Sequence, residues 1–218
     1  MPSDKILNLW KKNLGAVPDD VWNNAEITVL ILADNALHAI PARIGELRRL
    51  RTLDLGHNHI AELPDELGEL TELNDFLYLH DNCLEALPSA LGNLRKLRYL
   101  NISENRFSTF PDAISRMQSL LELRVTDNQL TDLPDSIAKL SRLRELHLRN
   151  NRLRTLPSTI SQLSELRQID LRGNPIEMLP ESLLEMPRLE KLDLRWVETL
   201  ARPAWLKELE ERGCLVYV

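Results

Sequence analysis

Three histidines and one aspartate are the residues of this sequence whose types and spacing come nearest to a metal site. His57 and His59 lie two residues apart, and His80 is followed directly by Asp81. Imidazole nitrogen and carboxylate oxygen atoms are common zinc ligands. Polar side chains of this kind are also ordinary in loops, and we therefore predict no metal at these residues.

Catalytic motifs are missing from the rest of the sequence. It contains no glycine-rich phosphate loop, no C-x-x-C pair and no H-E-x-x-H motif, and it has only seven glycines in all. These motifs carry phosphate binding, redox chemistry and zinc-dependent hydrolysis. Serine, histidine and aspartate residues occur, but their placement indicates no nucleophile with a base beside it. We predict a protein that is not an enzyme and needs no cofactor.

Composition and charge narrow the possible partners and compartment. The net charge is −6 and the isoelectric point is about 5.5, which disfavours nucleic acid, because its binding requires a basic face. The longest apolar run, residues 27–33, is too short to span a bilayer. Residues 1–12 show no signal peptide, and the two cysteines favour a reducing compartment. We expect a cytoplasmic protein, although export without a cleavable signal would leave the same sequence.

A fixed repeat of leucine, asparagine and proline must position all of these side chains. Its clearest copy runs from Leu50 through Asn58 to Pro64. Prolines recur every 23 residues, except for one step of 24 between Pro64 and Pro88. Self-similarity at such a period is typical of solenoids, in which each unit packs only on its neighbours.

Two apolar spacings within each repeat predict its secondary structure. A pair separated by one residue, such as Leu100 and Ile102, predicts a short strand with alternate residues inward. A pair spaced by three after the proline, such as Ile114 and Met117, predicts a short helical or 3-10 segment. Successive strands must then be parallel, with outward side chains in columns on a concave face and neighbours within a column about 4.8 Å apart.

One asparagine follows each predicted strand at a constant offset. An interior amide both donates and accepts hydrogen bonds, so it can satisfy backbone groups where the chain leaves the sheet. We therefore predict a structural asparagine ladder. Its members are Asn35, Asn58, Asn82, Asn105, Asn128, Asn151 and Asn174.

The two ends depart from the repeat, as capping units of solenoids do. We predict one domain over residues 1–218. Residues 1–26 form an N-terminal capping repeat, residues 27–188 hold seven full repeats, and residues 189–218 hold the last repeat with a C-terminal cap.

Particular residues mark these caps. Trp10 and Trp22 are expected to cover the first layer, and Val197 takes the place of the ladder asparagine in the last repeat. Residues 204–212 predict an amphipathic helix, and residues 215–218 predict a closing strand.

The predicted concave face holds the informative side chains. Aromatic residues gather on two neighbouring strands near the extra residue of the 24-residue step, which should bulge at Asn74 or Asp75. Arginines form a column further along. Tyrosine and arginine are enriched among binding hot spots. We predict that a protein partner contacts Phe76, Tyr78, His80, Tyr99, Arg124, His147, Arg149, Arg172 and Arg195, with the rings as anchors and the arginines reading acidic groups.

The pattern L-x-x-L-x-L-x-x-N-x-L resembles the leucine-rich repeat and covers nearly the whole chain. The 23-residue unit with Leu-Pro at its turn is similar to intracellular members of the Ras-suppressor and scribble type, the plant Ras-group relatives and bacterial relatives. This resemblance implies an α/β fold: a right-handed horseshoe solenoid with a parallel concave sheet and short helical or 3-10 convex segments.

The resemblance also implies that the concave side binds other proteins. We expect a monomeric scaffold or adaptor of the cytoplasm. Two alternatives stay open at this stage. The chain could be a substrate-recognition or regulatory module of a separate enzyme, for example a bacterial effector, or a sensor of a metal or small ligand through its histidines.

Overall fold

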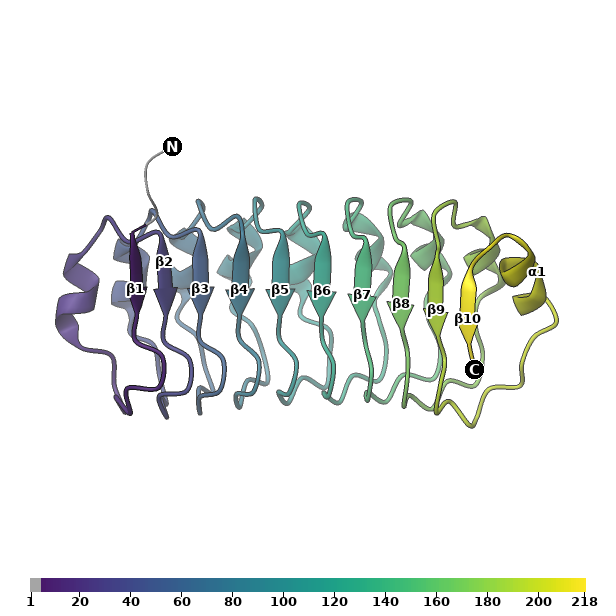
Figure 1. The fold of residues 1–218 in the computed structure, drawn as a ribbon, viewed down its shortest axis with the longest axis horizontal. Coiled ribbons are helices and arrows are strands. Elements are labelled where there is room, and N and C mark those ends of the chain that lie inside the picture. Colours follow the sequence, from purple (N-terminus) through teal and green to yellow (C-terminus); the bar gives the residue numbers. More distant parts are fainter. Residues whose placement is uncertain (1–4) are drawn as a thin grey trace.

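The structure is a computed structural model that describes residues 5–218. Within them, ten three-residue strands form one parallel sheet in sequence order, and each strand pairs with the next (Figure 1). The strands are β1 (Ile6–Asn8), β2 (Val29–Ile31), β3 (Thr52–Asp54), β4 (Phe76–Tyr78), β5 (Tyr99–Asn101), β6 (Glu122–Arg124), β7 (Glu145–His147), β8 (Gln168–Asp170), β9 (Lys191–Asp193) and β10 (Leu215–Tyr217).

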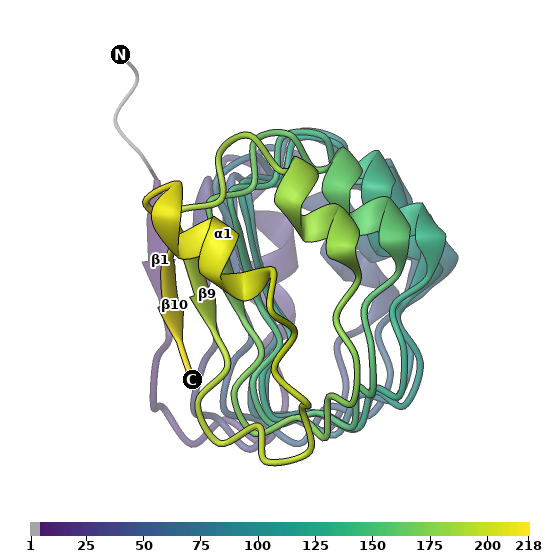
Figure 2. The same ribbon diagram turned by 90° about the vertical axis from the view of Figure 1, so that its right-hand side faces the viewer.

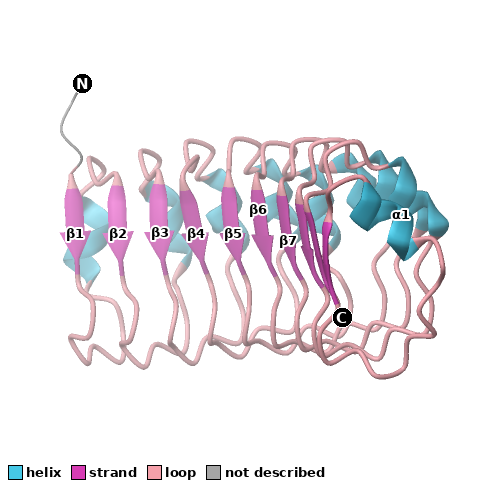
Figure 3. Ribbon diagram, turned by 45° about the vertical axis from the view of Figure 1, so that its right-hand side comes forward, coloured by secondary structure: helices cyan, strands magenta, loops and turns pink. Residues whose placement is uncertain are grey.

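Short helical segments form the opposite side of each coil. Figure 2, viewed along the stack, shows the sheet on one side and the helical segments on the other, with loops joining them at both edges. Figure 3 shows the strands side by side with the helical segments behind them. The segments are η1 (Asp19–Asn23), η2 (Ala42–Glu46), η3 (Asp65–Glu69), η4 (Ser89–Asn93), η5 (Asp112–Arg116), η6 (Asp135–Lys139), η7 (Ser158–Gln162), η8 (Glu181–Glu185) and the α-helix α1 (Leu206–Glu211). The prediction of a right-handed α/β solenoid is confirmed.

Leucines of successive coils form a continuous core. The central residue of β3, Leu53, is fully buried, as are Leu77 in β4 and Leu100 in β5. The repeat prolines from Pro18 to Pro180 each stand directly before a 3-10 segment. The carbonyl of each accepts a hydrogen bond from the residue three positions on, as from Ile44 to Pro41 at 3.0 Å. Proline fits there because it lacks the N–H that the start of a helix leaves without a partner.

The ladder asparagines are buried where the chain turns away from the sheet. The amide nitrogen of Asn58 donates to the carbonyls of Leu55 at 3.0 Å, Gly56 at 3.0 Å and Leu32 at 3.2 Å. Its oxygen accepts the backbone N–H of Leu37 at 2.9 Å. One side chain therefore satisfies backbone groups of its own coil and of the preceding one. All seven predicted asparagines are buried.

A strained residue precedes the asparagine in most coils. His57, Asp81, Glu104 and Asp127 have φ between 51° and 54°, although the left-handed conformation costs an L-residue roughly 1–2 kcal/mol. The asparagine hydrogen bonds offset this cost at the same turn.

The chain ends differ in part from expectation. Strands β1 and β10 occupy the two edges, and α1 ends at Glu211, two residues before Gly213, whose φ is 91°. Leu206 and Leu209 of α1 are buried, as its amphipathic pattern predicted. Trp22 is buried under the first layer, but Trp10 is 56% exposed, so the expectation that both tryptophans cover this layer is wrong for Trp10. No helix in residues 5–218 combines the length and hydropathy needed to cross a bilayer.

The extra residue of the 24-residue step lies ahead of β4. Asp75 donates its N–H to Arg51 at 3.0 Å, and its carbonyl accepts the N–H of Tyr99 at 3.2 Å. Asp75 thus takes part in the hydrogen bonds that precede β4, and Asn74 is the extra residue. Strand β4 therefore stays in register with β3 and β5.

Replacing Asn128 by leucine tests the ladder. The Asn128 amide donates to Ile102, Thr126 and Val125 carbonyls at 3.0, 3.2 and 3.4 Å and accepts the N–H of Phe107 at 3.0 Å. Leucine leaves the Phe107 N–H without a partner and removes one donor from three carbonyls that each keep another. A buried N–H without a partner costs about 1–3 kcal/mol. We expect Asn128→Leu to lower the free energy of unfolding by at least that amount in urea titrations.

The control is Asn93→Leu, because Asn93 is exposed at the end of η4. It should change the free energy by less than about 0.5 kcal/mol. Equal effects of the two substitutions would contradict the structural role of the ladder.

Candidate partner-binding surface on the concave face

Three aromatic rings form a contiguous cluster on the concave face. Phe76 and Tyr78 of β4 are stacked with ring centroids 5.8 Å apart, and Tyr99 of β5 lies 5.5 Å from Phe76 and 5.1 Å from Tyr78. Phe76 and Tyr99 are direct neighbours in the sheet register. We call Phe76, Tyr78 and Tyr99 the ring cluster. Phe76 remains 42% exposed, so the cluster offers apolar area to a partner.

Both phenols of the ring cluster are uncharged at neutral pH. Burial raises the pKa of Tyr99 to about 12. Burial and, to a smaller extent, the carboxylate of Asp54 also raise the pKa of Tyr78. A neutral phenol combines an apolar ring with a hydroxyl that both donates and accepts hydrogen bonds. The ring cluster therefore adds hydrogen-bonding groups to this face without adding charge.

His80 supports the ring cluster from its side. Its ring meets that of Tyr78 edge-on at 6.0 Å and that of His57 at 4.7 Å. Burial lowers the pKa of His80, and its Nδ1 atom is buried without a hydrogen-bond partner in the described part of the chain. A β-carbon on Gly56 would lie 2.4 Å from the His80 ring. The ring therefore packs where the neighbouring coil has no side chain.

The histidines first considered for a metal separate into two places. His57 Nδ1 lies 2.6 Å from Asp81 Oδ2, beside His80. His59 packs instead against His38, with ring centroids 5.3 Å apart. Among residues 5–218, the cluster whose ligand atoms come close enough to share an ion is Glu122, Glu145 and His147.

Two of the predicted arginines are already paired within the sheet. Arg172 makes two hydrogen bonds to Asp170, at 2.9 and 2.6 Å, and Arg195 makes two to Asp193, at 2.9 and 2.7 Å. Such bidentate pairs fix the guanidinium plane. The Asp193 carboxylate is only 1% exposed. Arg172 and Arg195 are therefore held in place by their own strands.

Arg124 and Arg149 differ in how well they are paired. Arg124 donates to Glu122 at 2.6 Å and lies 6.0 Å from the Tyr99 ring. Arg149 reaches Asp127 only at 3.4 Å, and its Nε is buried with no hydrogen-bond partner in residues 5–218. Arg124, His147, Arg149 and Arg172 line one pocket of about 310 Å³. Within it, the Arg149 side chain is 37% exposed and makes only the long contact to Asp127.

A second aromatic group at the C-terminal end was not predicted. Trp196 is 67% exposed with the Arg172 guanidinium 5.8 Å from its ring, and Arg195 lies 5.3 Å from the ring of Tyr217. Aligning the last units would have found Trp196, because it stands where Asn150 and Gly173 precede their ladder asparagines.

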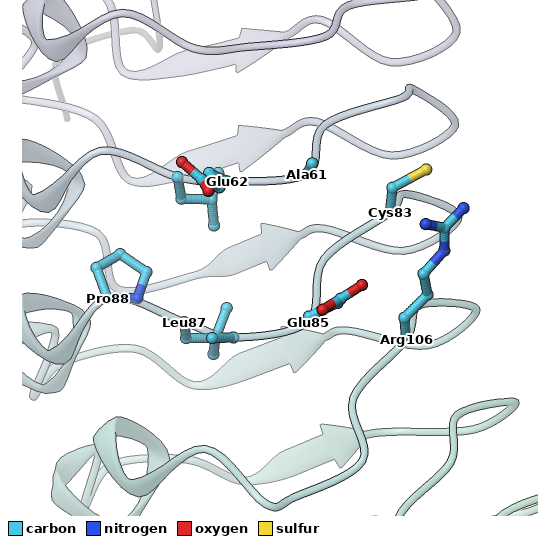
Figure 4. Close-up of a pocket in the computed structure, with 9 residues that line it drawn as sticks. Ala61, Glu62, Cys83, Glu85, Leu87, Pro88 and Arg106 are labelled. Carbon is cyan, nitrogen blue, oxygen red and sulfur yellow. The ribbon is translucent and has the colours of Figure 1, made fainter.

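Another groove lies along the loops, away from the sheet surface. It has a volume of about 560 Å³, and Figure 4 shows Cys83 and Arg106 at its outer end and Leu87 and Pro88 at the other. Its lining contains two carboxylates, one thiol and one guanidinium but no histidine. A thiol without a base beside it gives no reason to expect covalent chemistry there.

Comparison with protein families gives one match. The model described as leucine rich repeat matches residues 48–107, 76–130, 118–176 and 141–196. A search of curated proteins found no match.

Similar solved structures include a Leptospira interrogans leucine-rich repeat protein, with a TM-score of 0.76, 24% identity, and coverage of 98% of this chain and 66% of that one. A TDR receptor has a TM-score of 0.71, 26% identity and coverage of 80% and 32%. The Arabidopsis thaliana GASSHO1/SCHENGEN3 ectodomain, in complex with CASPARIAN STRIP INTEGRITY FACTOR 2, has a TM-score of 0.63, 30% identity and coverage of 82% and 25%. This chain thus spans about two thirds of the bacterial protein and a third or less of these two receptor structures.

The buried Asp193 predicts a pH-dependent contribution to stability. Burial alone would raise its pKa, but hydrogen bonds and charge from Arg195 and the charge of Arg172 hold the pKa of Asp193 below its ordinary value. Because the folded-state pKa is depressed, the interaction is fully present above the ordinary pKa of about 4. It is lost as the pH falls through the folded-state value.

We expect Asp193→Asn to lower the free energy of unfolding by about 2 kcal/mol at pH 7, with the difference shrinking toward pH 2 in urea titrations. The control Glu190→Gln removes an exposed partner of Arg167 and should cost less than about 1 kcal/mol. A deficit of Asp193→Asn that stays constant down to pH 2 would contradict the paired state of Asp193.

Proposed function

The chain belongs to the leucine-rich repeat family, and we propose that it is a protein-binding module, without chemistry of its own, that holds a protein partner on its concave face. Leucine-rich repeat proteins generally mediate protein–protein interaction. The observation that carries the proposal for this chain is the ring cluster, which presents three adjoining rings on one exposed sheet surface.

The ring cluster has the properties of a binding anchor. Aromatic residues dominate the energy of many interfaces where they enter desolvated contacts near the centre. Phe76, Tyr78 and Tyr99 are held by their strands and by one another, so little side-chain entropy remains to be lost on binding. Their central place in the sheet leaves strands on both sides to contact the rest of a partner.

Arg149 supplies a second contact of different chemistry. It lies two coils beyond Tyr99 and four residues past the register position of that ring, a separation of roughly 16 Å. Its side chain is 37% exposed and makes only a 3.4 Å contact to Asp127. A partner with an apolar or aromatic side chain for the ring cluster and a carboxylate for Arg149 would satisfy both. Arg172 and Arg195, fixed by Asp170 and Asp193, would shape the surface beside it.

Two similar structures support ligand binding by this fold. GASSHO1/SCHENGEN3 is in complex with CASPARIAN STRIP INTEGRITY FACTOR 2, and the plant peptide hormone receptor RGFR1 is in complex with RGF2. RGFR1 shares 26% identity and a TM-score of 0.61 with this chain, over 83% of this chain and 34% of the receptor. By analogy, we propose a protein or peptide segment as the partner here.

The proposal extends to the setting in which the module works. We take the 23-residue unit as that of the intracellular members, and we propose a monomeric scaffold or adaptor in the cytoplasm. Cys83 and Cys214 support a reducing compartment, because both thiols are free and free thiols are typical of such compartments.

Selection of displayed random peptides on the whole chain tests the partner-binding role. Peptides enriched on the wild type should bind the Tyr78→Ala/Tyr99→Ala variant at least about 30-fold more weakly, because losing a hot spot costs about 2 kcal/mol or more. Binding is measured by surface plasmon resonance with purified peptides. Circular dichroism checks that the variant is folded.

Met178→Ala serves as the matched control. Met178 is 69% exposed but lies between β8 and η8, outside the sheet, and its loss should leave peptide binding unchanged. Failure to enrich any peptide, or equal binding to the ring variant and the wild type, would contradict the proposal.

A further inference from the structure

Glu122, Glu145 and His147 lie together in the middle of the concave face. Glu122 belongs to β6, and it is the direct register neighbour of Glu145 in β7. His147 lies two residues after Glu145, so both side chains project from the same face of that strand. The potential ligand atoms of the three residues all lie within 4.8 Å of one another.

From this geometry we propose that Glu122, Glu145 and His147 form a binding site for a divalent transition-metal ion such as Zn²⁺. His147 Nε2 lies 3.1 Å from Glu145 Oε2 and 3.7 Å from Glu122 Oε1. Two ligands at ~2.1 Å from a tetrahedral zinc ion are roughly 3.4 Å apart. The two observed separations bracket this value, so small side-chain movements would complete the coordination.

The donor set selects among ions. One imidazole nitrogen with two carboxylate oxygens suits zinc and related transition metals, whereas magnesium prefers oxygen ligands and water. Three protein ligands leave a further position for solvent, as in open zinc sites. The ion would also relieve the repulsion between Glu122 and Glu145, because like charges directly opposite in a sheet are destabilising.

Arg124 competes with the ion for Glu122. Its Nε donates to Glu122 Oε1 at 2.6 Å, the oxygen that also faces His147. Metal binding requires this guanidinium to give up that oxygen, and the Tyr99 ring 6.0 Å away provides an alternative contact. The adjacent carboxylate, Asp170, is held by Arg172 and does not join the site.

Calorimetric titration of the tag-free, EDTA-treated whole chain with Zn²⁺ tests the site. We expect one zinc ion per chain and no response to Mg²⁺. His147→Gln should weaken zinc binding about tenfold or more, the loss already typical of residues that only orient a ligand. Glu145→Gln should do the same and serves if His147→Gln does not fold. Arg124→Gln should strengthen binding about tenfold, because a charge-assisted competing hydrogen bond is removed.

Two controls separate this site from other zinc ligands of the chain. His57→Gln removes a histidine with a similar carboxylate contact, at 2.6 Å to Asp81, and Cys83→Ser removes a thiol that is partly exposed. Both variants should bind zinc like the wild type. Because no partner protein takes part, the result does not depend on the proposed function.

Several outcomes would overturn the proposal. They are the absence of zinc binding by the wild type, unchanged zinc binding by folded His147→Gln or Glu145→Gln, and loss of binding by either control. Magnesium binding as strong as zinc binding would mean that the two carboxylates bind the ion without His147, contrary to the proposal. Arg124→Gln without a gain in affinity would contradict the position assigned to the ion.

Discussion

The hydrogen bonds of the buried asparagines are the constraint on which the rest of the structure depends. Each strand is only three residues long, and each coil must leave the sheet through a sharp turn at which backbone groups would otherwise be buried without partners. The amide of Asn58 satisfies carbonyls in two coils and accepts an N–H from the earlier one. Because the same bonds recur from coil to coil, they fix how far each strand is displaced from the next. The columns of side chains on the concave face follow from that displacement.

The concave face that results is divided by its chemistry. The ring cluster and its neighbours around β3 to β5 are largely uncharged, while β6 to β9 carry arginines and carboxylates that pair with one another. Pairing within the sheet keeps these charges from repelling one another and fixes their side chains. On our proposal, a partner gains mainly from contact with the rings, and the remaining hydrogen-bonding capacity of Arg149 adds selectivity for an acidic group. Because the other arginines are paired with carboxylates, they would contribute to binding through their fixed positions on the surface rather than through a net positive charge.

The sequence predicted the fold well because its signals are local and repeated. The spacing of leucines predicted the strands, and the prolines predicted where the 3-10 segments begin. The constant offset of the asparagines predicted where the chain turns away from the sheet. The cap helix was predicted from the spacing of Leu206 and Leu209. Trp10 was misjudged because a terminal unit has no preceding coil, so nothing in its spacing states whether a large ring turns inward. The sequence placed the extra residue at Asn74 or Asp75 but did not decide between the two, because that choice depends on the backbone hydrogen bonds before β4.

The candidate surface was only partly predictable, because the pairing of side chains depends on their rotamers, which the positions of the residues in the columns do not determine. Asp170 stands two residues before Arg172 in the sequence, but that spacing does not show that the two make a bidentate pair. It did not single out Glu122 and Glu145, whose closeness depends on the register of β6 and β7.

Photocrosslinking in the cell tests the central claim, binding of a protein partner at the concave face, most directly, with benzoylphenylalanine in place of either Tyr99 or Met178. The account predicts crosslinks to a protein partner from position 99 and none from position 178. Crosslinks from position 178 alone would contradict binding at the concave face.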